Sequence, residues 1–212
     1  MTKLLLIRHG YSSGNKERRF SGQIDLPLSD EGLHQADLVC DYIQKNYHVD
    51  AIYASDLQRA IDTVKPLAAA LDLPIQSHRE LREINEGSWQ GVLMTEVQEK
   101  YPEEFAFYKA NLGLHQFVDG ESYTTMLQRL LPMIDKIVAD NKDKTVVIGT
   151  HGAVVRGLLS VWQGVPLERL LEIPRVPNGT ITEVEIEGDS ARVIKLGFGD
   201  YLSERTGVHG VD

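Results

Sequence analysis

Two arginines and two histidines in this sequence follow short apolar runs that are typical of buried strands. Arg8 and His9 stand directly after residues 4–7, Arg59 lies shortly after a second run, and His151 ends a third. Arginine offers a planar fork of N–H donors that matches phosphate oxygens, and histidine can act as a nucleophile or as a donor. If the strands are neighbours, these side chains meet in one crevice suited to binding and transferring a phosphoryl group.

Strands and helices alternate through most of the chain. We predict strands at residues 4–7, 51–54, 73–76 and 145–149, a hairpin of residues 180–187 and 191–196, and helices at residues 29–46, 57–71, 121–141 and 153–162. This alternation predicts an α/β fold, a three-layer α/β/α sandwich with a mostly parallel central sheet. Ligands of such sheets bind outside the carboxyl ends of the strands, which is where the arginines and histidines stand.

The chain shows no internal repeat, low-complexity tract or linker, so we expect one domain that spans residues 1–212. Residues of about 90–120 are less regular and rich in aromatic side chains. We predict that they form helical excursions that cap the active site as a lid.

Composition narrows the classes of partner. The net charge is −9, which argues against a general nucleic-acid binder, although a local cluster of arginines can still attract a small anion. No apolar run approaches the length of a membrane span, and the N-terminus lacks the pattern of a secretion signal. Cys40 is the only cysteine and fits a helix core. We therefore expect a cytoplasmic protein whose ligand is a small phosphorylated metabolite, and the sequence leaves the oligomeric state open.

Seven segments occur in an order that carries a family resemblance. They are residues 6–10 with Asn15, residues 18–22, 26–32, 54–60 with Thr63, 81–91, 120–122 and 150–152. In this set the chain resembles the histidine phosphatase superfamily, also called the phosphoglycerate mutase-like family. The resemblance runs through nearly the whole chain and implies the phosphoglycerate mutase-like version of the α/β/α fold.

The resemblance also implies roles for the polar residues. His9 would be the nucleophile that becomes phosphohistidine, with its other ring nitrogen donating to a backbone carbonyl. Charge that develops on the phosphoryl oxygens would be held by Arg8, Arg59 and His151. Further phosphate contacts would come from Asn15, Ser21, Gly22 and Gly152, with Gly22 offering its backbone N–H.

Glu83 is the candidate general acid and then general base, and it must carry a proton for the first step. Glu86 is the nearest competitor for this role. The structural alternative makes Glu83 a surface partner of Arg79 or Arg82. We expect no metal and no cofactor, because the adjacent arginines would repel a cation from a site built on His9, His151 and Glu83.

The sequence departs from the family pattern at one point, where Tyr11 and Ser12 replace the usual acidic residue and threonine. Ser12 keeps the hydroxyl, whereas Tyr11 is expected to alter the pocket wall. The other histidines lack metal-ligand spacing and are interpreted as surface or lightly buried: His34, His48, His78, His115 and His209. The acidic residues at 183–189 are interpreted as a solvated hairpin edge.

Three functions remain open. The leading hypothesis is a metal-independent phosphatase that hydrolyses small phosphomonoesters through phosphohistidine on His9. The second is a phosphoglycerate mutase with the same chemistry. It is disfavoured because the middle segment is short and lacks a paired-arginine carboxylate site, with Lys100 and Lys109 as unpaired candidates. The third is a catalytically inactive relative that binds phosphorylated ligands, which the complete set of reactive residues argues against.

Overall fold

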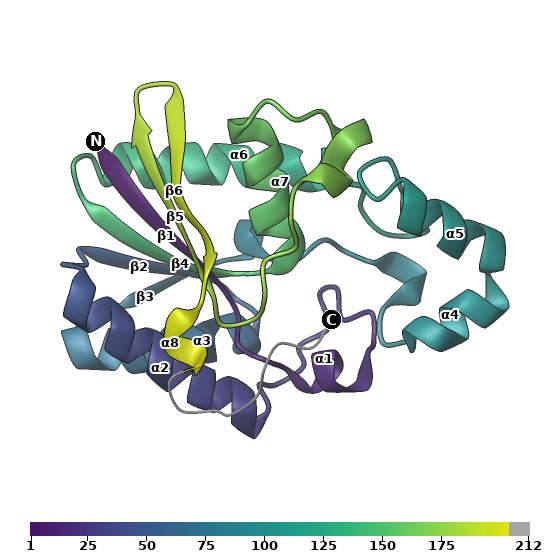
Figure 1. The fold of residues 1–212 in the computed structure, drawn as a ribbon, viewed down its shortest axis with the longest axis horizontal. Coiled ribbons are helices and arrows are strands. Elements are labelled where there is room, and N and C mark those ends of the chain that lie inside the picture. Colours follow the sequence, from purple (N-terminus) through teal and green to yellow (C-terminus); the bar gives the residue numbers. More distant parts are fainter. Residues whose placement is uncertain (204–212) are drawn as a thin grey trace.

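A computed structural model of the chain describes residues 1–203. His209 and the end of the expected 1–212 domain lie outside these residues. The centre of the fold is a six-stranded sheet of order β3-β2-β4-β1-β5-β6 (Figure 1). Its strands are β1 (Thr2–Arg8), β2 (Ala51–Ser55), β3 (Ile75–His78), β4 (Thr145–Thr150), β5 (Ile181–Glu187) and β6 (Ser190–Phe198).

The strand directions confirm a mostly parallel sheet. β1 pairs in parallel with β4, β4 with β2, and β2 with β3, whereas β5 is antiparallel to both β1 and β6. The third strand starts at Ile75 rather than at the predicted residue 73, and it forms the partly exposed edge of the sheet. The carboxyl ends of β1, β2 and β4 therefore meet at one edge, as the sequence predicts.

Helices cover both faces of the sheet, which confirms the three-layer arrangement (Figure 1). Leu5 and Ile7 pack with α2 (Asp30–Asn46) and α3 (Gln58–Leu71). The alternate residues Leu4 and Leu6 pack with α6 (Tyr123–Asp140) and α7 (Gly152–Trp162). Because side chains alternate across a strand and both sides of β1 are covered, its run of leucines is continuous rather than alternating.

The remaining elements are short. They are α1 (Ser13–Glu17), α4 (Met94–Lys100), α5 (Pro102–Ala110), α8 (Asp200–Ser203), and the 3₁₀ turns η1 (Arg79–Leu81), η2 (Gly87–Trp89) and η3 (Leu167–Glu172). In Figure 1, α4 and α5 project beyond the side of the sheet, within the segment expected to act as a lid. His115 packs there against Trp89 and Phe117 and is only 3% exposed, so its interpretation as a lightly buried histidine is wrong.

The loop after β1 presses against the start of α2. A Cβ atom on Gly10 would lie 2.5 Å from the carbonyl oxygen of Gly32, and one on Gly32 would lie 2.1 Å from that of Tyr11. Only glycine fits such backbone contacts, so these two positions fix the path of the chain that leaves His9.

Glu183 differs from its sequence interpretation. Its side chain is 4% exposed and receives Lys3 Nζ at 2.8 Å, Lys195 Nζ at 3.2 Å and the Tyr47 hydroxyl at 2.7 Å. The prediction of a solvated edge is wrong for this residue, because the neighbouring strands bring two lysines onto its face. We call Glu183, Lys3, Lys195 and Tyr47 the Glu183 cluster.

Within residues 1–203, no helix is both long enough and apolar enough to cross a membrane.

Candidate active site

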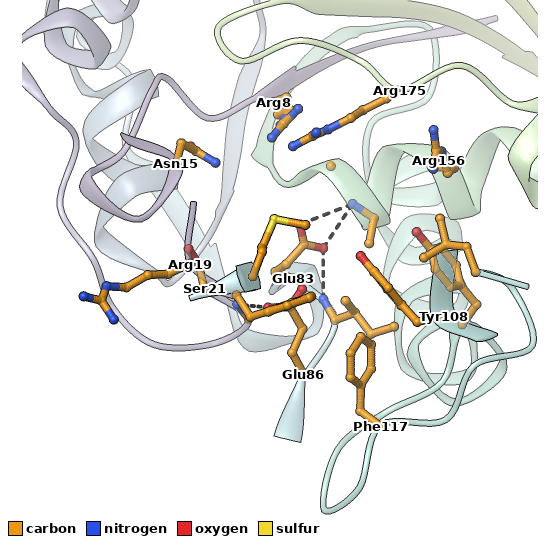
Figure 2. Close-up of a pocket in the computed structure, with 18 of the residues that line it drawn as sticks. Arg8, Asn15, Arg19, Ser21, Glu83, Glu86, Tyr108, Phe117, Arg156 and Arg175 are labelled. Atoms are coloured by element: carbon orange, nitrogen blue, oxygen red, sulfur yellow. Dashed lines mark hydrogen bonds between the residues drawn. The ribbon is translucent and has the colours of Figure 1, made fainter. Parts of the chain in front are cut away.

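A cavity of about 380 Å³ opens at the carboxyl ends of the central strands (Figure 2). It is lined by eight of the nine residues singled out in the sequence, namely Arg8, His9, Asn15, Ser21, Gly22, Arg59, Glu83 and Gly152. The ninth, His151, is fully buried beside His9, and the two ring centroids lie 5.2 Å apart in an edge-to-face arrangement. The structure therefore brings the whole predicted set together.

His9 continues the β1 ladder, because its backbone N–H donates to the carbonyl of Thr150 at 2.8 Å. Its Nδ1 lies 2.8 Å from the carbonyl oxygen of Gly10. A carbonyl can only accept, so Nδ1 carries the proton and Nε2 keeps a free lone pair. Burial, reinforced by Arg59 and Arg8, holds the pKa of His9 well below its ordinary value. The ring is therefore neutral at working pH, as a nucleophile must be.

Four buried nitrogens around His9 have no hydrogen-bond partner within residues 1–203: Arg8 Nε, Arg59 Nε, and both ring nitrogens of His151. Buried polar groups are nearly always paired, so this set of nitrogens suits an anionic ligand held in the cavity. Burial, followed by Arg59 and His9, also holds the pKa of His151 well below its ordinary value. An anion in the cavity would offset that repulsion and favour a protonated, donating His151.

Both arginines are held by backbone carbonyls. Arg59 Nη1 and Nη2 donate at 2.7 Å to Ile24 and Gly22, respectively. Arg8 Nη1 donates to Val176. Burial, together with nearby Arg175, lowers the pKa of Arg8 to about 10, so the group stays charged at neutral pH.

The two glycines behave differently. Gly152 lets the start of α7 approach Arg8, since a Cβ there would lie 3.3 Å from Arg8 Nε. Gly22 donates its N–H to Glu86 Oε2 at 2.7 Å, so this donor is not free for a phosphate in the structure. The expectation that Gly22 offers a free backbone donor therefore does not hold here.

Asn15 is oriented by its carbonyl oxygen, which accepts from Ser12 N–H, Ser12 Oγ and Asn178 Nδ2. Its amide nitrogen is left to donate, and Figure 2 shows it pointing into the cavity. The Ser21 hydroxyl is buried without a partner in the described chain. Ser12 thus preserves the loop, whereas Tyr11 does not line the cavity, so the expected effect of Tyr11 on the pocket wall is wrong.

Glu83 follows the turn η1 in the chain, and its carboxylate lies against the first residues of α7. Its carboxylate accepts from the N–H of Ala153 at 3.1 and 3.2 Å and from its neighbour Ile84 at 3.0 Å (Figure 2). Arg82 instead forms a two-pronged pair with Asp56, with both distances 2.6 Å. The alternative that made Glu83 a partner of Arg82 is therefore wrong.

Glu86 faces the same cavity in a different setting. Burial, followed by the charge of Glu83, raises its pKa to about 8. At neutral pH Glu86 therefore holds a proton and remains a second candidate acid.

Sequence reasoning missed a support behind Glu83. Arg129 on α6 donates to the carbonyls of Glu83 and Glu80, both at 2.8 Å, and pairs with Glu121 at 2.6 Å. Glu121 also accepts from Asn85 N–H at 2.9 Å. The Gly-Glu-Ser segment thus fixes the backbone that carries the candidate acid. The sequence pointed to Glu121 through its place in the family segment 120–122, but no spacing rule connects Glu121 with Arg129.

Sequence reasoning also missed two arginines on the far side of the cavity, Arg156 and Arg175, which stand there with Tyr108 and the candidate Lys109. Of the two arginines, Arg156 carried a sequence signal, because it follows Ala153 by three positions and so shares a helix face with it. Among residues 1–203, no group of three His, Cys, Asp or Glu side chains is placed to hold a metal ion.

Residues 4–198 match the profile of the histidine phosphatase superfamily (branch 1). This chain belongs to that superfamily. The histidine phosphatase is 30% identical over 96% of its length to phosphoserine phosphatase 1 of Hydrogenobacter thermophilus, also covering 96% of that protein. It is 33% identical over 74% of its length to the metal-independent phosphoserine phosphatase of Arabidopsis thaliana, covering 67% of that protein.

The fold of a solved relative agrees. Bacillus stearothermophilus YhfR superposes with a TM-score of 0.90 at 30% identity, over 95% of this histidine phosphatase and the whole of that chain. The chain is therefore a phosphomonoesterase of the histidine phosphatase type.

Proposed function

We propose that this phosphatase hydrolyses small phosphomonoesters by transferring the phosphoryl group to Nε2 of His9. The observation that carries the proposal is the ring of buried, unpartnered nitrogens around a histidine whose Nδ1 is tied to Gly10. Phosphoryl transfer asks mainly for in-line positioning and for charge stabilisation, and this arrangement provides both.

In the first step, the P–Nε2 bond forms while the bond from phosphorus to the alcohol oxygen breaks. Arg8, Arg59 and a protonated His151 receive the charge on the three equatorial oxygens, and Asn15 adds a neutral donor. Loss of one such donor typically costs roughly 3–4 kcal/mol of barrier. The proton on the leaving alcohol comes from Glu83.

In the second step, a water oxygen attacks phosphorus, its proton passes to Glu83, and the P–N bond breaks. Glu83 is preferred to Glu86 because its carboxylate is held against the first turn of α7, the helix that begins directly after His151. One oxygen of the Glu86 carboxylate, Oε2, already accepts the Gly22 N–H.

The proposed substrates are small, since the cavity holds about 380 Å³. Relatives named phosphoserine phosphatases make O-phosphoserine the first ester to test. The proposal includes no nucleic-acid or membrane partner, no metal and no cofactor. It also includes a cytoplasmic site of action, in keeping with a single, buried cysteine at position 40.

The test is to trap the intermediate. Wild-type protein quenched during turnover of ³²P-labelled ester should carry alkali-stable, acid-labile label, as expected of a phosphoramidate. His9→Ala should carry none, while His48→Ala, at a histidine whose side chain is 92% exposed, should label normally. Label that persists in His9→Ala would overturn the proposal, and loss of turnover in a metal chelator would overturn its metal-independent part.

The role of Glu83 as general acid is tested with esters whose leaving groups differ in their need for a proton. Glu83→Gln should lose turnover of alkyl phosphates, yet should still be phosphorylated by p-nitrophenyl phosphate, whose phenolate leaves without a proton. The phosphoenzyme should then accumulate, because its hydrolysis needs the base. If Glu86→Gln behaves in this way and Glu83→Gln does not, the two roles must be exchanged.

One observation favours the mutase alternative: Arg156 and Arg175 line the cavity together with Lys109, the cation that the sequence offered for a carboxylate. We retain hydrolysis, in line with the named phosphatases above. Incubation with 3-phosphoglycerate and trace bisphosphoglycerate separates the two. Rapid isomerisation with little free phosphate would show a mutase.

A further inference from the structure

The carbonyl groups that hold Arg59 belong to one short turn, residues 21–24. Gly22 and Ile24 of this turn accept the two Nη groups of Arg59, both at 2.7 Å. The donors of a guanidinium lie in a rigid fork, so its direction follows from the position of its acceptors. A shift of the turn would therefore move the arginine charge away from the phosphoryl group that the proposed function places at His9.

The turn is held in place by residues 83–90, the segment that also carries the candidate acid. Within residues 1–203, three hydrogen bonds join the two segments. They run from Gly22 N–H to Glu86 Oε2 at 2.7 Å, from Gln23 N–H to Gln90 Oε1 at 2.6 Å, and from Gln23 Nε2 to the carbonyl of Glu83 at 3.0 Å. Gly22 therefore connects Glu86, which accepts its N–H, with Arg59, which donates to its carbonyl.

Glu86 and Gln90 make the same kind of contact with different chemical groups. Each presents one side-chain oxygen to a backbone N–H of the turn. The amide of Gln90 carries no charge at any pH. The carboxyl of Glu86 is also neutral at pH 7, because burial, followed by the charge of Glu83, raises its pKa to about 8. The turn thus receives from both side chains an oxygen without a charge.

A charge on Glu86 would oppose the chemistry of the site. The titratable groups whose charges interact with it are Glu83, Arg59 on α3, Tyr108 on α5 and Tyr123 on α6. Figure 2 shows the side chains of Glu83 and Glu86 near each other in the cavity. An ionised Glu86 would add a second negative charge beside Glu83 and would compete with the substrate phosphate for Arg59. Burial raises the pKa of both tyrosines, so neither carries a charge at neutral pH.

From these contacts we infer that Glu86 is a positioning residue that holds Arg59 in place through Gly22 and does so as a neutral carboxyl group, so that its ionisation sets the upper pH limit of phosphoryl transfer. Glu86 acts here through Arg59 and needs no contact with the substrate, which separates this role from that of a general acid. The inference rests on the proposed function, because phosphoryl transfer to His9 is the step that uses the charge of Arg59.

The first test is the pH dependence of kcat/KM for p-nitrophenyl phosphate. The leaving group of this ester needs no proton, so ionisation of Glu83 does not limit the first step, and kcat/KM includes no step after formation of the phosphoenzyme. The ester itself is fully ionised above about pH 7. In the wild type, kcat/KM should fall roughly tenfold between about pH 7 and about pH 9.5. The midpoint should lie near the pKa of Glu86, about 8.

The second test compares variants at the two contacts. Glu86→Ala should lower kcat/KM at pH 7 by about 10- to 100-fold, as expected for a misplaced charged group. Glu86→Gln should restore most of this loss, because it keeps an oxygen for Gly22 N–H, and its kcat/KM should show no decline near pH 8. Gln90→Ala loosens the same turn without removing the titrating group, so it should lower kcat/KM and keep the decline. Glu99→Gln, at an exposed residue of α4, is the matched control and should match the wild type in both respects.

The path through Arg59 is tested by a double-mutant cycle. In an Arg59→Gln background, Glu86→Ala should cost less than about threefold, because the group that Glu86 positions is already lost. A loss as large as in the wild-type background would overturn this path. A decline near pH 8 that persists in Glu86→Gln, or a failure of Glu86→Gln to restore activity, would overturn the role of the neutral carboxyl.

The pH profile of Glu86→Gln decides the question even if Glu86→Ala does not fold, which urea unfolding would show. Failure of the proposed function has a different signature. In that case the wild type would form no label on His9, whereas the wild type labels normally in every outcome that overturns the role of Glu86 alone.

Discussion

The active-site cavity and the Glu183 cluster are two groups of partly buried charges on the same sheet, and they are built in opposite ways. In the Glu183 cluster the carboxylate receives two lysines and a tyrosine, so no charge is left without a counterpart. In the cavity, arginine and histidine nitrogens are buried without partners, and like charges face one another. Two polar regions of similar burial thus differ in whether their partners are supplied by the chain.

This difference separates stability from function. A buried charge that is fully paired within the chain has nothing left to bind, so it contributes to folding alone. A buried donor without a partner lowers the free energy of unfolding but is ready for a ligand at no cost of rearrangement. Substitutions in the two regions should therefore affect different measurements, and the following predictions are ordered by the size of the expected effect.

The largest effect is expected for His9→Ala. Removal of the nucleophile should lower kcat/KM by about 10⁴-fold or more, while the free energy of unfolding should change by only about 1 kcal/mol, the value of one hydrogen bond to Gly10. Steady-state kinetics and urea unfolding would measure the two quantities. A large loss of stability would mean that the cavity is also a structural centre, and the contrast with the Glu183 cluster would fail.

The second effect is the stabilisation of the protein by a ligand bound in the cavity. Inorganic phosphate at about 100 times its Kd should raise the free energy of unfolding by about 2.7 kcal/mol, because it binds the folded state and not the unfolded chain. A thermal scan should show this as a rise in Tm of roughly 5–10 °C for a chain of this size. Arg8→Gln should abolish most of the shift, whereas Arg192→Gln, at a surface arginine paired with Glu185, should retain it.

The third effect belongs to the Glu183 cluster. Glu183→Gln should lower the free energy of unfolding by about 1–3 kcal/mol with kcat/KM within twofold of the wild type. Burial opposes the charge of Glu183, but hydrogen bonds from Lys3, Tyr47 and Lys195 outweigh it and lower its pKa. The contribution of Glu183 to the free energy of unfolding is therefore present above the unfolded pKa of about 4.3, and it is lost as the pH falls through the folded pKa.

The control for the third prediction is Glu187→Gln, on the same strand but exposed. Urea unfolding of both variants between pH 3 and pH 7 would show the difference. The structural role of the Glu183 cluster would be contradicted if both variants lost the same free energy of unfolding. It would also be contradicted if the difference between Glu183→Gln and the wild type did not shrink in acid.

The last effect differs in sign, because Glu86→Gln should gain stability rather than lose it. Burial raises the pKa of Glu86 to about 8, so the wild type keeps its full stability below about pH 4.3 and loses stability as the pH rises to about 8. Glutamine keeps an oxygen for Gly22 N–H and has no proton to lose. The variant should therefore be more stable than the wild type at pH 8, by an amount that shrinks as the pH falls and vanishes at pH 4. Exposed Glu99→Gln should show no such trend.

The sequence predicts the parts of the molecule that depend on local periodicity and on strand ends. The buried runs before His9 and before His151 define β1 and β4, and because both strands are central and parallel, the reactive residues meet as expected. The edge strand β3 was misplaced by two residues, because a half-exposed strand has a weak apolar pattern.

Contacts between distant segments could not be predicted. Glu183 was assigned to solvent because its partners Lys3 and Lys195 lie on different strands, and only the antiparallel pairing of β5 with β1 and β6 brings them together. Arg175 lies in a segment without periodicity, so nothing local directs it to the cavity. Arg129 reaches Glu83 across the packing of α6 on η1, which a single sequence does not encode in any spacing.

Asn178 gives the site a consequence for the order of folding. Its side-chain amide donates to the carbonyl of His9, 169 positions earlier, and to Asn15 Oδ1. In the sheet, β1 also lies between β4 and β5, two strands that come much later in the sequence. Such contacts between distant parts of a chain carry a high entropic cost and form late. During refolding, phosphatase activity should therefore return only after the C-terminal strands have docked, behind the recovery of helical signal, which makes turnover a reporter of the last steps of assembly.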